Sequence, residues 1–416
     1  MDPQPRLGLA ALSEIAFDGG NLTPFRAELT AQVLRGSAGA LMDLSVIEQL
    51  EGNLDAGLNW QAQALKGCRL FRTFRRQNAP LKVLVFAAPI HMGGNTPVEF
   101  LLPGDRFDII TCYPRAGLPI ELPEYDIAFC AAPADADDAE AFLDLVRDLT
   151  AGGPPVLNLP DHLIQPERDR LPEVFRNVPG LRCPETQRIA RDELREILTN
   201  TWEDTALSDL GPYPFVVRPV GSHAGFGLAK LDDQAAFTSY LTTRDEQEFY
   251  VGEFIDYATP ADGQFRKYRI VLVGGKPFPA HMAISQNWDV WYMNADMKSS
   301  TEKRAEEARF MEEFDSFSAR HASAFSALAD GLNLDYFGID CAEDAAGNLV
   351  VFEADNALIV HNMDCRQTFP YKERHMQAIF DAFEALLMEH CVERSAKAHG
   401  PAPIRAALPV GRVYPA

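Results

Sequence analysis

The segment FGIDCAEDAAGNLVVFEADNALIVHN, Phe337 to Asn362, is the most informative part of the chain. Two apolar runs that end in acidic residues flank the turn sequence DAAGN, and this arrangement predicts a β-hairpin. Glu353 and Asp355 are two positions apart on one strand, so both face the same side. Asp340 ends the other apolar run and can join them across the hairpin.

Three carboxylates on one face repel each other unless a cation lies among them, and hard oxygen ligands of this kind suit Mg²⁺ that bridges phosphates. A solvated acidic hairpin is the alternative. The acids interrupt apolar runs where burial is expected, and an uncompensated buried charge is costly. The pattern therefore favours a metal site formed by Asp340, Glu353 and Asp355.

A second segment, PFVVRPVGSHAGFGLAKL, precedes the hairpin by about 120 residues and spans 214–231. A β-branched run delivers Arg218, and a glycine-rich loop follows. Glycines let backbone N–H groups turn toward a phosphate, and Arg218 supplies positive charge at the end of the strand. The segment indicates phosphate binding by Arg218 and by the loop residues Gly221, Ser222, His223, Gly225 and Gly227.

Composition limits the class of protein and its partners. The 416 residues carry 60 acidic and 38 basic side chains, for a formal net charge of −22, so nucleic acid and anionic membranes are not expected partners. No stretch approaches the roughly 20 apolar residues of a membrane helix, and the first residues lack the pattern of a signal peptide. Seven scattered cysteines without a CxxC pair predict reduced thiols, and a cytoplasmic location is expected.

The periodicity predicts four regions. Residues 1–79 read as helical, with one unit that resembles a tetratricopeptide repeat, and form either a small bundle or a partner-binding module. In 80–160, apolar runs alternate with a helix pattern, which predicts a small parallel α/β domain; its segment HMGGNTP is either a plain turn or a substrate loop. Residues 161–395 mix hairpins and helices, including a helical stretch between Thr301 and Leu332. A tail, 396–416, follows.

The two segments, with motifs between and before them, resemble the ATP-grasp superfamily, especially its RimK-like and glutathione-synthetase-like ligases. The further motifs are NLPDHLIQPERDRL followed by VPGLRCPET, then EFYVGEFIDY, then FRKYRIVLVGGKPFPAHMAIS. The resemblance covers roughly residues 161–387. It implies an ATP-grasp fold, of the α/β (α+β) class, behind a small pre-ATP-grasp domain and an N-terminal helical segment.

The resemblance also implies a set of site residues. ATP would be held by Arg170 and Arg218, which stand where lysines are usual, by Lys267 and the loop, and by the hinge residues Glu253, Phe254 and Ile255. Arg269 and Arg218 would be catalytic. The metals on the acidic hairpin would be two Mg²⁺ ions, for which Mn²⁺ can substitute.

Two departures from the family pattern affect the metal and reaction centre. Asp355 replaces the usual metal-binding asparagine, and Gly338 stands where some relatives carry an arginine that steadies the tetrahedral intermediate. That role would then fall to another cation, with Lys298, Arg304 and Arg366 as candidates.

Two further features lie near the expected reaction centre. The segment SQNWDVWYMNADMKSS, 285–300, is rich in aromatic residues and is either a substrate-facing loop or a corner of the core. His361 is either an acid–base group near the acceptor or a structural histidine.

The implied activity is an ATP-dependent carboxylate–amine ligase that works through an acyl phosphate and releases ADP and phosphate. The carboxylate and the amine could be small molecules or peptides, and the helical front end could support a homodimer. Two alternatives remain. One is a small-molecule kinase of the same fold, and the other is a nucleotide-binding adaptor whose N-terminal helices bind a protein.

Overall fold

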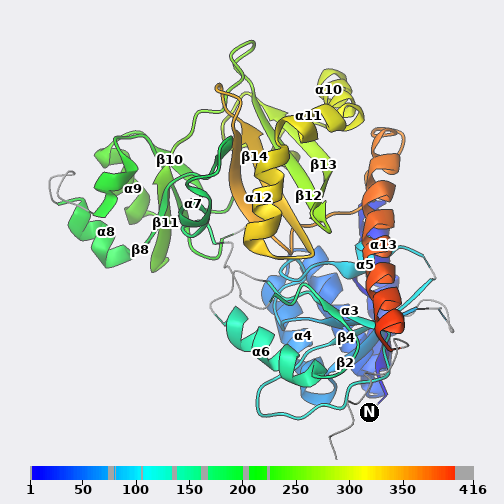
Figure 1. The fold of residues 1–416 in the computed structure, drawn as a ribbon. Helices are drawn as coiled ribbons and strands as arrows, with labels where there is room; N and C mark the ends of the chain where they lie inside the picture. The colour runs from blue at the N-terminus through cyan, green and yellow to red at the C-terminus, as the bar shows by residue number, and fades with distance from the viewer. Residues whose placement is uncertain are drawn as a thin grey trace, which may run out of the picture.

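The computed structural model describes residues 2–73, 79, 81–104, 106–133, 138–160, 167–199, 206–222 and 225–398. Three β-sheets and the helices around them form an α/β molecule (Figure 1). The fold class predicted from the sequence, mixed α/β with helices at the N-terminus, is confirmed.

Among the described residues, four helices lie in the N-terminal region that the sequence predicted to be helical. They are α1 (Leu9–Phe17), α2 (Thr23–Leu34), α3 (Ala38–Leu50) and α4 (Leu54–Gly67). Their apolar side chains form a core of their own, with Leu12 and Ile47 fully buried. The start of α1 is held by Asp43 of α3, whose carboxylate accepts the backbone N–H groups of Leu7 (2.7 Å) and Gly8 (3.0 Å).

The first sheet has six strands in the order β1-β2-β4-β3-β5-β6. The strands are β1 (Gln4–Arg6), β2 (Leu70–Thr73), β3 (Leu81–Phe86), β4 (Phe107–Cys112), β5 (Ile127–Cys130) and β6 (Val156–Leu157), with α5 (Val98–Leu101) and α6 (Ala139–Thr150) between them. β3 is parallel to both β4 and β5, and its continuous apolar run reflects burial on both faces. β1 and β2 belong to this sheet, so it extends across the boundary expected near residue 80.

The second sheet is a four-stranded antiparallel unit in the order β10-β9-β11-β8. Its strands are β8 (Thr186–Ala190), β9 (Phe215–Pro219), β10 (Ala229–Leu231) and β11 (Glu248–Glu253), covered by α8 (Arg191–Ile197), η2 (Ala206–Leu210) and α9 (Gln234–Thr242). It has a separate core in which Phe215, Phe237 and Phe249 are fully buried.

The third sheet has the order β13-β12-β14-β15-β7. Its strands are β7 (Leu181–Arg182), β12 (Phe265–Val273), β13 (Lys276–Ser285), β14 (Tyr336–Glu343) and β15 (Leu349–Asp355), with α7 (Leu171–Phe175) and η3 (Tyr292–Asn294) nearby in the chain. β14 and β15 form the predicted acidic hairpin. The stretch predicted as one long helical region is three helices, α10 (Thr301–Glu312), α11 (Phe314–Arg320) and α12 (Ala322–Leu332).

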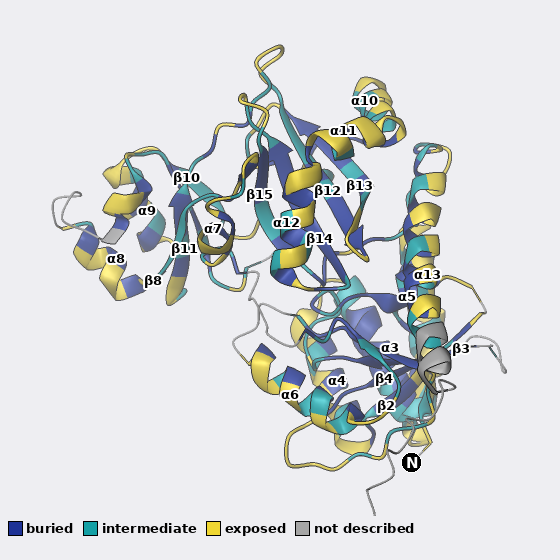
Figure 2. Ribbon diagram, in the orientation of Figure 1, coloured by how far each residue is buried: buried dark blue, intermediate teal, exposed yellow. Residues whose placement is uncertain are grey.

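The first and third sheets are joined by a common core and by α13 (Lys372–Ala398), which runs along both in Figure 1. Phe383 of α13 contacts Phe129 of β5 and Tyr336 of β14, each with ring centroids 5.4 Å apart. A buried polar link adds to this junction. Thr96 Oγ1 donates to the Asn356 carbonyl (2.8 Å), and Asn356 Nδ2 donates to the Ala132 carbonyl (2.9 Å). Figure 2 shows the buried residues continuing across this region.

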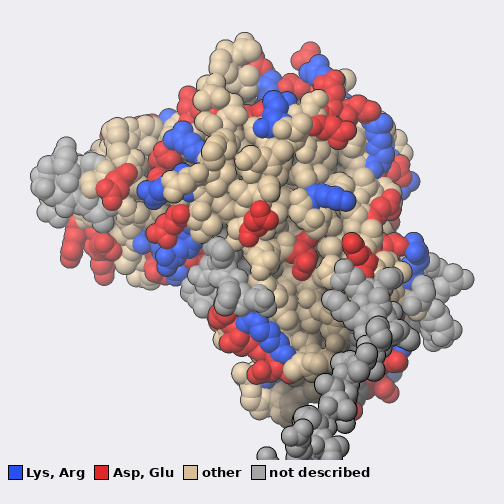
Figure 3. Space-filling model, viewed as in Figure 1, with Lys and Arg blue, Asp and Glu red and all other residues tan. Residues whose placement is uncertain are grey.

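The surface drawn in Figure 3 carries acidic and basic side chains interspersed with one another. All seven cysteines are free thiols, and five of them are buried. In the part of the chain that the structure describes, no helix combines the length and the apolar character needed to cross a membrane.

Candidate functional site

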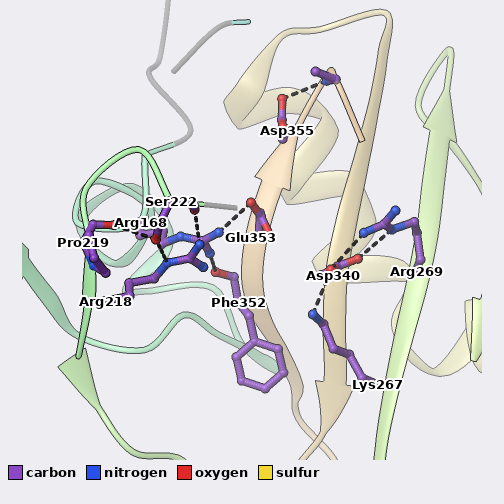
Figure 4. A network of polar contacts seen from close by, with 11 residues as sticks. Arg168, Arg218, Pro219, Ser222, Lys267, Arg269, Asp340, Phe352, Glu353 and Asp355 are labelled. Atoms are coloured by element: carbon purple, nitrogen blue, oxygen red, sulfur yellow. Dashed lines mark hydrogen bonds and ion pairs between the residues drawn. The ribbon is translucent and has the colours of Figure 1, made fainter. Parts of the chain in front are cut away.

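A cavity of about 160 Å³ lies between the second and third sheets. We call it the inter-sheet cavity. Apolar side chains form most of its wall and come from α7, β9, β15, the residues after β11 and the segment before η3, among them Leu171, Val216, Ile255, Trp288, Val290 and Val351. Arg168, Arg218, Lys267 and Glu353 lie together at one end of the cavity (Figure 4), and Glu253 and Asp289 also line it. The cavity therefore combines an apolar slot with a charged end.

Asp340 and Glu353 lie directly opposite each other on β14 and β15. The Asp340 carboxylate accepts Lys267 Nζ at 2.9 Å, and it accepts Arg269 Nε at 2.8 Å and Nη2 at 3.1 Å (Figure 4). Burial alone would raise the pKa of Asp340, but the charges of Arg269 and Lys267 outweigh it and hold that pKa well below its usual range. Asp340 is thus an anion at neutral pH although it is only 5% exposed.

Glu353 has its own cation. Arg168 Nη2 lies 2.5 Å from Glu353 Oε1, and Arg168 Nη1 donates to the Phe352 carbonyl at 2.9 Å. Burial opposes ionisation of Glu353, yet Arg168 lowers the pKa of the carboxyl to about 2. The two predicted carboxylates at paired strand positions are therefore both charged.

Asp355 is oriented differently. Its Oδ1 accepts the backbone N–H of Ala357 at 2.7 Å, and Figure 4 shows its side chain away from Asp340 and Glu353. In the described residues, no group of three or more His, Cys, Asp or Glu side chains is arranged to hold a metal ion. The structure brings two of the three predicted metal ligands together, because Asp355 ends β15 and turns back onto the following backbone.

Arg218, from β9, faces the charged end of the inter-sheet cavity. Its Nε donates to Ser222 Oγ (3.1 Å), its Nη2 donates to the Ser222 carbonyl, and Ser222 Oγ donates to the Pro219 carbonyl (2.7 Å). Burial and the neighbouring charge of Arg168 lower the pKa of Arg218 to about 10. Among the side chains that the structure describes, no carboxylate forms an ion pair with Arg218.

Arg168 lines the inter-sheet cavity, whereas Arg170, the residue predicted to bind phosphate, does not. The Arg170 side chain is 56% exposed and lies 3.5 Å from Glu173. Both arginines occur in the motif QPERDRL, and spacing alone could not choose between them.

Positive charge exceeds negative charge around the paired carboxylates. Four cationic side chains, Arg168, Arg218, Lys267 and Arg269, surround Asp340 and Glu353 (Figure 4). Arg168 and Arg218 also repel each other. An entering polyanion would be attracted to this end of the cavity and would relieve that repulsion.

The predicted hinge residues lie along the cavity wall at the end of β11. Glu253 accepts Arg182 Nη2 (2.8 Å) and the Glu185 N–H (3.1 Å), which fixes the strand end. Lys230 Nζ lies 4.4 Å from the centre of the Phe254 ring, and Ile255 is buried. Trp288 contacts Phe254 edge-on at 5.7 Å and completes this apolar wall, a role that the sequence pattern did not assign to it.

The glycine-rich loop follows β9 next to Arg218. Gly221, Gly225 and Gly227 all have positive φ, at 70°, 75° and 67°. A Cβ on Gly227 would lie 2.5 Å from Arg244 Nη2 and 2.6 Å from Pro219 Cδ, so this position requires glycine. His223, predicted as part of the loop's site, lies outside the described residues.

A second, larger cavity of about 320 Å³ adjoins the first. We call it the α1 cavity, because Leu9, Ser13 and Phe17 of α1 line it. Lys267 and Val290 line both cavities, Glu353 lines only the first, and Asp340 and Arg269 line the second. The paired carboxylates therefore stand where the two cavities meet.

The aromatic segment 285–300 separates the two cavities. Trp288 lines the inter-sheet cavity, whereas Trp291, Tyr292 and Met293 line the α1 cavity. His361 also lines the α1 cavity, with its ring edge-on to Phe17 at 5.1 Å, and burial lowers its pKa.

Lys298, Arg304 and Arg366, the cations predicted to steady the reaction intermediate, do not line the α1 cavity. Arg304 donates to the carbonyls of Met297 and Lys298, and Arg366 pairs with Glu373 at 3.2 Å. At Gly338 a Cβ would lie 3.0 Å from Leu358, which leaves little room for a side chain.

Comparison with known proteins finds distant structural likenesses. No family model matches the chain, and no curated protein matches it. A RimK domain ATP-grasp protein from Sphaerobacter thermophilus is 18% identical, with 74% of this chain and 99% of that chain covered and a TM-score of 0.40. The D-alanine–D-alanine ligase from Bacillus anthracis, complexed with ATP, is 14% identical (77% and 99% covered, TM-score 0.42). That of Coxiella burnetii is 12% identical (76% and 98% covered, TM-score 0.45).

Proposed function

We propose that the protein is an ATP-dependent ligase of the ATP-grasp type, which activates a carboxylate as an acyl phosphate and joins it to an amine. One observation carries the proposal. Asp340 and Glu353, surrounded by four cations, stand at the junction of two cavities, one with an apolar slot and the other large enough for a second substrate. The order of the sequence motifs supports the same activity.

The inter-sheet cavity would take ATP. The adenine would lie against Phe254, Ile255 and Trp288, and the phosphates would extend toward Arg168 and Arg218. Arg218 is free to turn from Ser222 to a phosphate without breaking an ion pair with a described carboxylate. The glycine loop beside it offers backbone N–H groups to the same phosphates.

Asp340 and Glu353 would offer oxygens to a divalent ion once Lys267, Arg269 and Arg168 gave up part of their contacts. Cβ atoms of directly opposite residues on antiparallel strands are about 5 Å apart, and Mg²⁺ in nucleotide sites uses one or two carboxylates together with phosphate oxygens. When bound, the ion would offset charge on the transferred phosphoryl group. Asp355 would contribute only if it released the Ala357 N–H.

The reaction would proceed in two balanced steps. A substrate carboxylate oxygen in the α1 cavity attacks the γ-phosphorus, the bond to the β-phosphate oxygen breaks, and ADP leaves. The amine nitrogen then attacks the acyl carbon, phosphate leaves with the former carboxylate oxygen, and the nitrogen loses a proton. Lys267 and Arg269, which face Asp340 at the junction, would hold the carboxylate and phosphoryl oxygens in line.

Trapping with hydroxylamine tests this function. The protein is incubated with ATP, Mg²⁺, hydroxylamine and pools of carboxylates, and both ADP and hydroxamate are measured. We expect ADP release that depends on a carboxylate and yields a hydroxamate. Carboxylate-independent phosphorylation of an alcohol, without hydroxamate, would instead identify a kinase.

A further inference from the structure

The α1 cavity has an uneven distribution of polar and apolar groups. Where it meets the inter-sheet cavity, the cations Lys267, Arg269 and Arg168 stand against the two carboxylates Asp340 and Glu353. This end therefore carries a net positive charge, which suits a carboxylate. His281 lies on β13 opposite Arg269 of β12. It is kept neutral because burial and the charge of Arg269 lower its pKa well below the usual value.

The other cation of the cavity is already neutralised. Lys372 Nζ lies 2.8 Å from Asp364 and 3.4 Å from Glu307, and the Tyr292 hydroxyl accepts from it at 2.6 Å. Lys372 is almost completely buried in this network. The charge available for a substrate anion is thus confined to the end near Asp340.

The remaining wall is apolar and open to solvent. Ten large apolar side chains are exposed among the described residues, and four of them, Phe17, Trp291, Met293 and Ile359, line this one cavity. Exposed apolar groups gathered around a cavity indicate that an apolar ligand covers them. The rings of Phe17 and Phe100 both lie edge-on to His361, at 5.1 and 6.3 Å, so the wall facing α1 is largely aromatic.

We propose that the carboxylate substrate carries a ring-sized apolar group, that this group packs against Phe17 of α1, and that α1 thereby selects the substrate. The carboxylate lies at Lys267 and Arg269. This inference rests on the proposed ligase function for the step that follows binding. It gives the N-terminal helices a role inside the site, in place of a separate partner-binding role.

Matched carboxylates test the selectivity. We compare 3-phenylpropionate with glutarate, a dicarboxylate, and with acetate in the hydroxamate assay. Burial of a phenyl group predicts a kcat/KM for 3-phenylpropionate at least about tenfold above those of the other two. Equal values, or higher values for glutarate, would overturn the inference while leaving the ligase function standing.

Substitution of Phe17 tests the role of α1. Phe17→Ala removes a side chain that is 54% exposed, so the fold should survive, and a thermal melt checks this. We expect a several-fold rise in KM for 3-phenylpropionate, with kcat and the KM for ATP and acetate unchanged. Leu34→Ala is the control, because Leu34 is exposed on α2 away from the cavity, and it should change none of these values.

Calorimetry separates this inference from the ligase function. 3-Phenylpropionate is titrated into the protein with a non-hydrolysable ATP analogue and Mg²⁺, which requires no turnover. Binding that Phe17→Ala weakens and Leu34→Ala does not would support the inference even if no hydroxamate formed in any assay. Absence of binding, or equal binding to the parent and to Phe17→Ala, would overturn it.

Discussion

Arg168, Arg170 and Arg218 differ in their partners, and this difference gives a sharp test of phosphate binding. Arg168 pairs with Glu353, Arg170 lies on the surface beside Glu173, and Arg218 contacts Ser222. Hydrogen bonds to charged groups contribute about 1.5–3 kcal/mol. We therefore expect Arg218→Ala to weaken ATP binding by roughly 10- to 100-fold in calorimetry, with little change in melting temperature.

The other two variants complete this comparison. Arg168→Ala should weaken ATP binding by a similar factor and also lower the melting temperature, because the half-buried Glu353 loses its partner. Arg170→Ala should change neither quantity. Weaker ATP binding in Arg170→Ala, with normal binding in Arg168→Ala, would contradict the geometry described above.

The carboxylates give a second test at the level of single residues. Glu353→Gln and Asp340→Asn remove a charge where the two cavities meet, and we expect each to reduce carboxylate-dependent ADP release on the order of 100-fold. Asp355→Asn should cost less than about tenfold, because an asparagine oxygen can still accept the Ala357 N–H. Equal losses in all three variants would show that Asp355 turns into the site during turnover.

For single residues, the sequence was enough to predict which side chains belong to the site, but not which side chains or backbone groups they contact. The order of motifs was enough to predict Arg218, Lys267, Arg269, Asp340 and Glu353, and the structure gathers them. The motif order could not distinguish Arg168 from Arg170, because the two arginines are only two positions apart in the same motif. The turn of Asp355 onto Ala357 depends on how β15 ends, which strand periodicity does not determine.

Among the elements, the β14–β15 hairpin was predictable because its turn and apolar runs are local signals. The strands β1 and β2 were not predicted, since they have only three and four residues and gain their stability from pairing in a distant sheet. The region 301–332 reads as continuous helix by periodicity, but it breaks into α10, α11 and α12 so that Phe314 and Phe317 can face the core.

The anchoring of α1 predicts a measurable pH dependence. Burial raises the pKa of Asp43 from 3.8 to about 6, so the folded protein binds this proton more tightly than the unfolded chain. Stability from this group is fully present below about pH 4 and is lost as the pH rises through 6. Across that range the loss amounts to about 3 kcal/mol, at roughly 1.4 kcal/mol per pKa unit.

Asp43→Asn should remove this dependence, because an amide does not titrate. In urea unfolding, the free energy of the variant relative to the parent should therefore rise by up to about 3 kcal/mol between pH 4 and pH 7. A difference between Asp43→Asn and the parent that is constant with pH would refute the explanation.

At the scale of the whole molecule, the separate hydrophobic cores predict two units that unfold independently of each other. The first and third sheets share the core around Phe129, Tyr336 and Phe383, whereas the second sheet has its own core around Phe237. The core shared by the first and third sheets joins residues more than 200 positions apart. Sequence periodicity is a local signal and could not reveal it, so the sequence predicted a domain boundary at residue 160.

Hydrogen exchange in two matched variants measures this independence. Phe383→Ala should cost about 3–5 kcal/mol and speed exchange in β5 and β14 together, with β9 and β11 unaffected. Phe237→Ala should do the reverse, because Phe237 is fully buried in the second unit. Uniform acceleration in both variants would mean that the chain opens as one cooperative unit.

The buried link between Thr96 and Asn356 has a consequence for engineering. Asn356 follows Asp355 directly and hydrogen-bonds to two loops of the first sheet, so the acidic hairpin takes its position partly from residues of the front half. A chimera that exchanged residues 1–160 for those of another protein would lose the Thr96 contact unless the graft also supplied a hydroxyl at position 96. Exchange of the two halves should therefore be tolerated better when the residues at positions 96 and 356 are transferred together.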